Sequence, residues 1–120
     1  MRGVIGGLKL SVQLITTVNT YGLAAEACSL ETGSGRWRLV ADRLSWAGNQ
    51  QRAPGRVELL VTKQGDKLVL TGSAAMDEPI RCLKIILRDL PPCTVYDSLG
   101  DQHWWGMGGE REITAEGLIS

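Results

Sequence analysis

Apolar and polar residues alternate along much of this chain with a period of two, which is typical of β-strands that bury one face. In residues 8–18 the leucines and a valine occupy every second position, with lysine, serine and glutamine between them. Residues 21–31 alternate in the same way and favour a strand, but their alanine-rich centre is also compatible with a helix. Two apolar runs within residues 56–74 flank KQGD, where Gly65 can take the positive φ of a tight turn, so this stretch predicts a β-hairpin.

The remaining segments also favour strands. Residues 36–41 and 43–46 indicate either a pair of strands or one strand bent at Asp42. Side chains alternate in character along residues 80–90, and prolines bound this segment on both sides. The segment predicts a buried strand rather than a helix. Shorter strands at 93–97 and 111–114, and turns at 19–22, 32–35, 47–55 and 76–79, complete the pattern.

The order of these elements predicts the fold class. About eight to ten short strands, with turn signals every 8–12 residues and no convincing helix, are typical of an antiparallel β-sandwich or a barrel-like fold. The length suits a single all-β domain over residues 1–120. The last residues, AEGLIS, form no closing turn, which favours a domain cut from a larger chain.

Composition indicates which residue types form the core and which classes of partner are disfavoured. Phenylalanine is absent, so leucine, valine and isoleucine are expected to form the core, with Trp37 and Trp46 as core or edge fillers. Thirteen basic and thirteen acidic residues cancel, which argues against a protein that binds nucleic acid by neutralising phosphates. The arginines that come nearest to a basic patch are interrupted by acids and predict a solvated strand face. They are Arg36, Arg38, Arg43, Arg52 and Arg56, interrupted by Asp42 and Glu58.

The N-terminal segment and the cysteines bear on localisation. Residues 1–27 have the basic start and the AEA triplet of a signal peptide, but Lys9 and Gln13 interrupt the apolar region, so a strand is favoured. No stretch reaches the ~18 apolar residues that a membrane helix needs, so no membrane partner is expected. The odd count of three cysteines favours reduced thiols in a cytoplasmic protein, with one Cys82–Cys93 disulfide as the alternative.

Residues 100–110, GDQHWWGMGGE, gather the most reactive side chains of the chain. His103 is the only histidine, and neither a nucleophile elbow nor the close ligand pairs of a zinc site accompany it. The glycine-rich stretches lack the Lys-Ser/Thr of a phosphate-binding loop. Several nearby acids are reminiscent of the paired carboxylates of glycosidases, yet no pair is singled out. No catalytic residue, metal ligand or cofactor is therefore expected in this chain.

The adjacent tryptophans offer a binding function instead. Trp104 and Trp105 carry flat apolar faces on which sugar rings can stack. Consecutive strand residues point to opposite sides, so we expect one of the two to be mostly buried and the other at least partly exposed. The sequence predicts a ligand-binding site formed by Asp101, His103, Trp104, Trp105, Glu110 and Arg111.

The stretch WWGMGGER resembles the GLGER-type turn that closes the N-terminal β-sandwich of α-glucosidase-like glycoside hydrolases of family 31. The matching residues are Gly106, Met107, Gly109, Glu110 and Arg111, with Gly108 as an extra residue. The strand and connector from Ile80 to Pro92 are similar in layout, so the resemblance covers roughly 30 residues. It implies a sandwich near the substrate entrance of a catalytic (β/α)8 barrel, with the catalytic aspartates in that barrel and not in this chain.

These observations predict a non-catalytic accessory module of a carbohydrate-active enzyme, which packs on a separate catalytic domain or shapes its entrance. The alternative is a stand-alone protein-interaction or structural β domain without small-molecule chemistry. The expected partners are a carbohydrate, an adjacent catalytic domain or further copies of the chain. Neutral charge argues against nucleic acid in either case.

Overall fold

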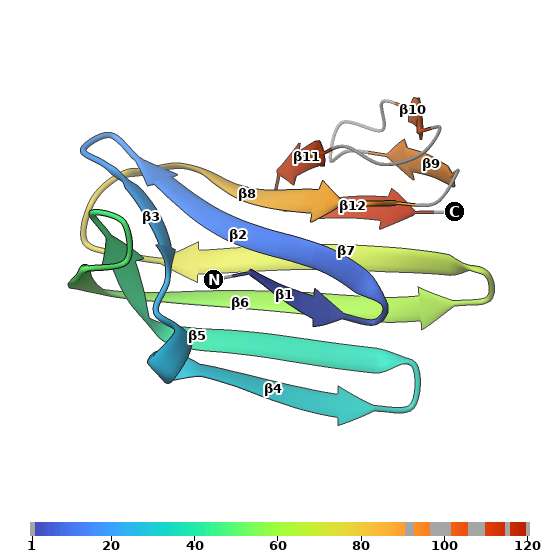
Figure 1. Cartoon of the computed structure of the whole chain (residues 1–120), viewed down its shortest axis with the longest axis horizontal. Helices are drawn as coiled ribbons and strands as arrows, with labels where there is room; N and C mark the ends of the chain where they lie inside the picture. Colours follow the sequence, from blue (N-terminus) through green and yellow to red (C-terminus); the bar gives the residue numbers. More distant parts are fainter. Residues whose placement is uncertain (1, 91–92, 97–101, 106–109, 115, 120) are drawn as a thin grey trace.

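The chain folds into one antiparallel β-sheet that curls into a half-barrel (Figure 1). This computed structural model describes residues 2–90, 93–96, 102–105, 110–114 and 116–119, with side chains for 3–90 and 93–95. Within these ranges the only helical element is the short 3₁₀ helix η1 (Ala25–Ala27), and no helix is long and apolar enough to span a membrane. The predicted all-β, antiparallel class is confirmed, whereas the two packed sheets of a sandwich are not established.

Twelve strand segments make up the sheet, and they amount to about nine extended strands, as the alternation predicts. The sheet order is β10-β9-β12-β7-β6-β5-β3-β2-β8-β11, with β1 paired to β2 and β4 paired to β5. In chain order the segments are β1 (Arg2–Ile5), β2 (Leu8–Thr16), β3 (Thr20–Leu23), β4 (Cys28–Gly33), β5 (Arg36–Trp46), β6 (Gln51–Gln64), β7 (Lys67–Ala75), β8 (Ile80–Arg88), β9 (Cys93–Tyr96), β10 (Gln102–Trp105), β11 (Glu110–Thr114) and β12 (Glu116–Ile119).

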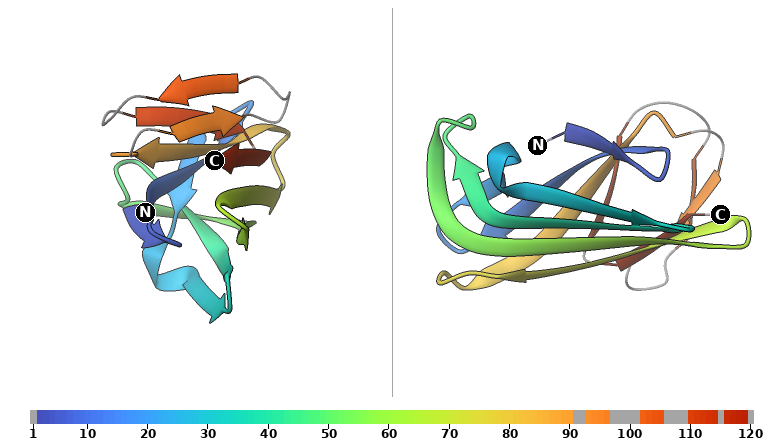
Figure 2. Two further views of the ribbon diagram at one scale, coloured as in Figure 1. Left: turned by 90° about the vertical axis from the view of Figure 1, so that its right-hand side faces the viewer. Right: turned by 90° about the horizontal axis from the view of Figure 1, so that it is seen from below.

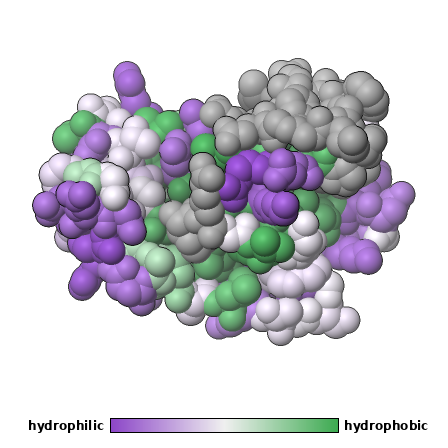
Figure 3. Space-filling model, in the orientation of Figure 1, coloured by the Kyte–Doolittle hydropathy of each residue, from purple (hydrophilic) through white to green (hydrophobic). Residues whose placement is uncertain are grey.

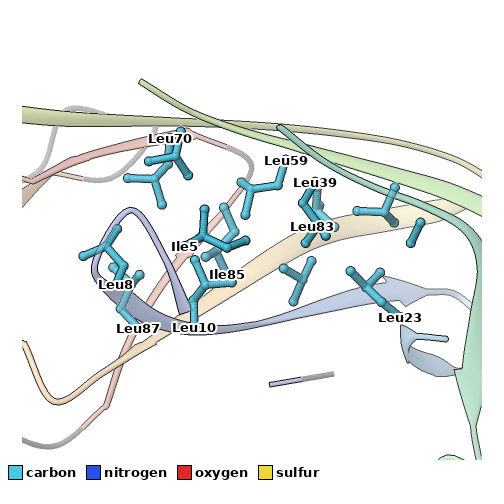
Figure 4. Packing of buried hydrophobic residues seen from close by; sticks show 14 of the residues in the cluster. Ile5, Leu8, Leu10, Leu23, Leu39, Leu59, Leu70, Leu83, Ile85 and Leu87 are labelled. Atoms are coloured by element: carbon cyan, nitrogen blue, oxygen red, sulfur yellow. The ribbon is translucent and has the colours of Figure 1, made fainter. Parts of the chain in front are cut away.

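The core lies inside the curl and is built from aliphatic side chains (Figure 4). On β2 every second residue is buried, and on β8 the residues between Cys82 and Arg88 alternate in the same way, as the sequence pattern predicts. Trp37 packs against this core from its edge, while Trp46 is exposed. The largest fully buried side chains are Leu10, Val12, Leu14, Leu23, Leu44, Val57, Leu59, Val61, Leu70, Ile85 and Leu87.

Strands β5 and β6 are long and bent, which produces much of the curl (Figure 2). The register between them shifts between Ala41 and Arg43, so the sequence alternative of one strand bent at Asp42 is the correct one. Pro54 pairs opposite Arg43 beside this bulge, where a residue without a backbone N–H is tolerated. The predicted loop at 47–55 is therefore too long, because β6 begins at Gln51.

Two other predicted boundaries are wrong. The turn predicted at 19–22 lies earlier, because β3 already begins at Thr20 and the backbone N–H groups of Val18 and Asn19 donate to Thr16 Oγ1. The strand predicted at 21–31 is interrupted by η1, so it forms two strands that pair with different parts of β5. The 56–74 hairpin is confirmed, with Gly65 at a φ of 66°.

Strands β11 and β12 are consecutive in the chain but lie near opposite ends of the sheet order. Residues 110–114 pair with β8, and residues 116–119 pair with β7 and β9. Only one residue separates β11 from β12 in the sequence. The short segment formed by β11 and β12 therefore pairs with both β8 and β7, although β7 and β8 lie far apart in the sheet order.

Candidate interaction site

Five of the six residues of the predicted sugar site belong to β10 and β11, the first and last strands of the sheet order. His103, Trp104 and Trp105 belong to β10, the outermost strand beside β9, and they pair opposite Val95, Thr94 and Cys93. Their side chains lie outside the described part of the chain, and Asp101 lies outside it entirely. The expected division of the tryptophans into one buried and one exposed residue therefore stays a prediction.

The two other predicted site residues belong to β11. Glu110 pairs opposite Arg88, and Arg111 pairs opposite Leu87. Their side chains also lie outside the described part of the chain. The predicted site formed by these residues therefore stays a prediction, and we look for a binding site among the side chains that the structure describes.

A tight polar cluster lies at the end of the sheet where β2 turns into β3. Both carboxylate oxygens of Glu78 accept hydrogen bonds of 2.7 Å, one from Thr16 Oγ1 and one from the hydroxyl of Tyr21. The hydrogen bond to Glu78 is the main cause that raises the pKa of Tyr21, with burial as the second. These hydrogen bonds connect the β2–β3 turn to the loop between β7 and β8.

The arginine-rich outer face consists largely of ion pairs. Arg38 donates to Glu58 at 2.6 Å and reaches Glu31 at 3.4 Å, and Arg52 pairs with Glu26. Hydrogen bonding to Arg38 lowers the pKa of Glu58. Ion pairs on exposed strands contribute little stability but neutralise the face. The predicted solvated strand face agrees with these contacts, and in the described ranges no His/Cys/Asp/Glu cluster is suited to a metal ion.

A more distinctive feature is an opening in the sheet between β1 and β4, which we call the seam. Strand β3 joins β2 to β5 along their second halves only. Along their first halves β2 carries β1 and β5 carries β4, and the described residues pair neither β1 nor β4 with any other strand. Among the described residues, β1 and β4 therefore each keep one strand edge unpaired, and residues of both strands line the seam.

The seam contains an apolar hollow of about 200 Å³, lined by Gly3, Val4, Ile5, Cys28, Ser29, Leu30 and Leu39. Leu30 pairs opposite the buried Leu39 and is still 48% exposed, and Val4 is 63% exposed. Apolar surface gathers over the region between β1 and β4 in Figure 3. Cys28 is half-buried there, and burial raises the pKa of its thiol, which favours the neutral form.

The seam is closed at both of its ends. At one end Gly6, which follows β1 with a φ of 60°, lies so close to Trp37 that a Cβ on this glycine would come within 3.1 Å of the ring. At the other end β3 fills the space between β2 and β5. The free edges are therefore confined to a short slot, which limits what can lie in it.

Sequence reasoning missed the seam because its two sides are distant in the sequence. Exposed Val4 and Leu30 are single apolar residues in short segments, and neither signals a site by itself. The one local signal was the short apolar run of 3–5 ahead of two glycines, which predicts a short hairpin strand. Comparison of the chain with family models, curated proteins and solved structures finds no match. The resemblance to family 31 glycoside hydrolases thus stays a sequence-based expectation.

Proposed function

We propose that this chain is a protein-interaction domain that receives an extended segment of a partner protein as an additional β-strand in the seam. The observation that carries the proposal is the pair of strand edges, on β1 and β4, that are unpaired among the described residues and whose residues line one apolar hollow. An added strand supplies backbone donors and acceptors to both edges and apolar side chains to the hollow. Strand addition of this kind is a recurring mode of peptide recognition.

The seam exposes both backbone groups and apolar side chains. Unpaired backbone groups at a sheet edge can bind another chain, and proteins usually cover or charge such edges. Here the described side chains of β1 are Gly3, Val4 and Ile5, none of them charged, and β4 carries one acid, Glu31. A partner strand would pair these backbone groups and cover the exposed surface of Leu30 and Val4.

A selection experiment tests the proposal with peptides of unbiased sequence. A library of random linear eight-residue peptides is selected against the full chain, and the tightest binder is measured by calorimetry. We expect enriched peptides with apolar residues at alternate positions. N-methylation of central residues in the peptide should weaken binding by about tenfold or more, since it removes the backbone donors that strand addition uses.

Two matched variants locate the binding site. Leu30→Lys places a charge in the hollow and should weaken binding by about tenfold or more. Val18→Lys alters another exposed apolar residue, in the β2–β3 turn, and should not weaken binding. Absence of any enriched peptide, or binders that tolerate both N-methylation and Leu30→Lys, would contradict strand addition in the seam.

We also propose a second candidate, the carbohydrate-binding accessory module that the sequence suggests. The observation in its favour is that Trp104 and Trp105 are consecutive on β10, the outermost strand of the sheet. Its test is a titration with maltose and a panel of α-glucosides, followed by tryptophan fluorescence. Trp104→Ala or Trp105→Ala should abolish the response, and Trp46→Ala is the control. No response to any sugar would exclude this candidate.

A further inference from the structure

We propose that the strand bound in the seam runs antiparallel to both β1 and β4, with apolar residues facing the hollow and a lysine or arginine opposite Glu31. This inference rests on the proposed interaction function and specifies its partner. Three observations carry it: the directions of the flanking strands, the side chains on the inner face of the seam, and the charge on its outer face.

The strand directions fix the orientation. Every pairing among the described strands is antiparallel, so β1 and β3 both run opposite to β2, β5 runs opposite to β3, and β4 runs opposite to β5. It follows that β1 and β4 run in the same direction, as their arrowheads do in Figure 1. One strand placed between them in the opposite direction is antiparallel to both and continues the order of the sheet. A strand in the other direction would be parallel to both edges.

The inner face fixes the alternation. Leu30 and Cys28 pair opposite the buried Leu39 and Ala41, so both lie on the core side of β4. On β1 the position opposite buried Leu10 is Gly3, which has no side chain to cover the hollow. An apolar side chain of the bound strand can occupy this space. Successive strand residues alternate between faces, so the partner needs apolar residues at every second position.

The outer face supplies the charge preference. Glu31 is the one charged residue among the described side chains of β1 and β4, and its side chain is 73% exposed. On the β5 side it has Arg38 as its cross-strand partner, whereas its other side faces the seam. Opposite charges at directly facing strand positions attract, so a basic residue of the bound strand is favoured beside Glu31.

The length of the slot limits the paired segment. Strand β1 has four residues, and the Gly6–Trp37 contact follows it directly. At a rise of ~3.3 Å per residue, four residues span about 13 Å. The partner segment should therefore pair over about four or five residues, with flanking residues that leave the sheet.

Orientation is measured with the tightest binder from the peptide selection, carrying a nitroxide label at one end or the other. Amide signals of the ¹⁵N-labelled full chain report the position of the label by paramagnetic broadening. Because β4 runs from Cys28 to Gly33, an N-terminal label should broaden Thr32 and Gly33. A C-terminal label should broaden Cys28 and Ser29. The reverse pattern would overturn the orientation while leaving the interaction function intact.

A charge exchange tests the side-chain preference. Glu31→Lys should weaken a binder that contains a basic residue by about twofold to fivefold, and exchange of that residue for glutamate should restore the affinity. A binder that keeps its affinity through both exchanges would overturn the charge preference. A concentration-dependent dimer that Leu30→Lys dissociates would assign the seam to a second copy of the chain and overturn the peptide proposal.

Discussion

Tyr21 donates a hydrogen bond of 2.7 Å to Oε2 of Glu78, a residue 57 positions later in the chain. Thr16 donates to the other carboxylate oxygen, and its own Oγ1 accepts the N–H groups of Val18 and Asn19. The turn between β2 and β3 is thus tied to the loop between β7 and β8. Tyr21 and Thr16 are each only 4% exposed, so water cannot readily replace these partners.

Removal of the Tyr21 hydroxyl should destabilise the fold. Tyr21→Phe keeps the ring but leaves Glu78 with one hydroxyl donor, and a hydrogen bond to a charged group contributes about 1.5–3 kcal/mol. We expect a loss of about 1–2 kcal/mol in the free energy of unfolding, since Glu78 is only half-buried. Urea unfolding measures it, with Thr17→Val, an exposed change in the same turn, as the control. Equal stability of Tyr21→Phe and the parent chain would contradict the assignment.

The same contact predicts a loss of stability at alkaline pH. The pKa of Tyr21 is raised above 10.0 in the folded chain, chiefly by its hydrogen bond to Glu78. At pH values between the pKa of Tyr21 in the unfolded chain and its pKa in the folded chain, the native state binds more protons than the unfolded state. The free energy of unfolding therefore falls as pH rises above about 10. Measured from pH 9 upward, the free energy of unfolding should therefore fall more steeply with pH for the parent chain than for Tyr21→Phe. Parallel curves would contradict the prediction.

Gly55 should not tolerate a side chain, although its φ is not positive. A Cβ at this position would lie 2.6 Å from Cδ1 and 3.0 Å from Cγ of Leu44, which is fully buried and cannot move aside freely. Overpacking of a core typically costs about 1–3 kcal/mol, and we expect this loss for Gly55→Ala. Gly33→Ala is the matched control, because its nearest neighbour would be a backbone oxygen 4.0 Å away. Thermal unfolding of both variants distinguishes them.

The ion pair between Arg38 and Glu58 should be detectable as a lowered pKa of the Glu58 carboxyl group. The hydrogen bond from Arg38 lowers the pKa of Glu58 below 4.5. NMR titration of the side-chain carboxyl should show this depression, and Arg38→Gln should move the pKa of Glu58 upward. The stability that the pair contributes is present above the unfolded pKa and is lost as pH falls through the folded pKa. An unchanged pKa in Arg38→Gln would contradict the pairing.

The fold was largely predictable where the pattern is local. The alternation of residues 8–18 and 80–90 and the turn at Gly65 each specify a strand or hairpin from neighbouring residues alone. The bulge beside Pro54 was not predictable in this way. A proline-containing stretch is typical of a loop, and only its pairing opposite Arg43 makes it part of a strand.

The candidate site was much less predictable, because it depends on which edges remain unpaired. The sequence directs attention to His103 and the two tryptophans, since their side chains carry the most chemistry. The seam depends instead on backbone groups, which every residue has and no residue type signals. Its two sides are brought together by the pairing of β3 with β2 and β5 and by the approach of Gly6 to Trp37.

The stretch formed by β11 and β12 has a consequence for solubility. Its first half covers an edge of β8 and its second half an edge of β7. Local detachment of these few residues would uncover both edges at once and leave their backbone groups open to pairing with another molecule. The tendency of this protein to aggregate should therefore follow the local opening of this stretch, well before the core itself unfolds.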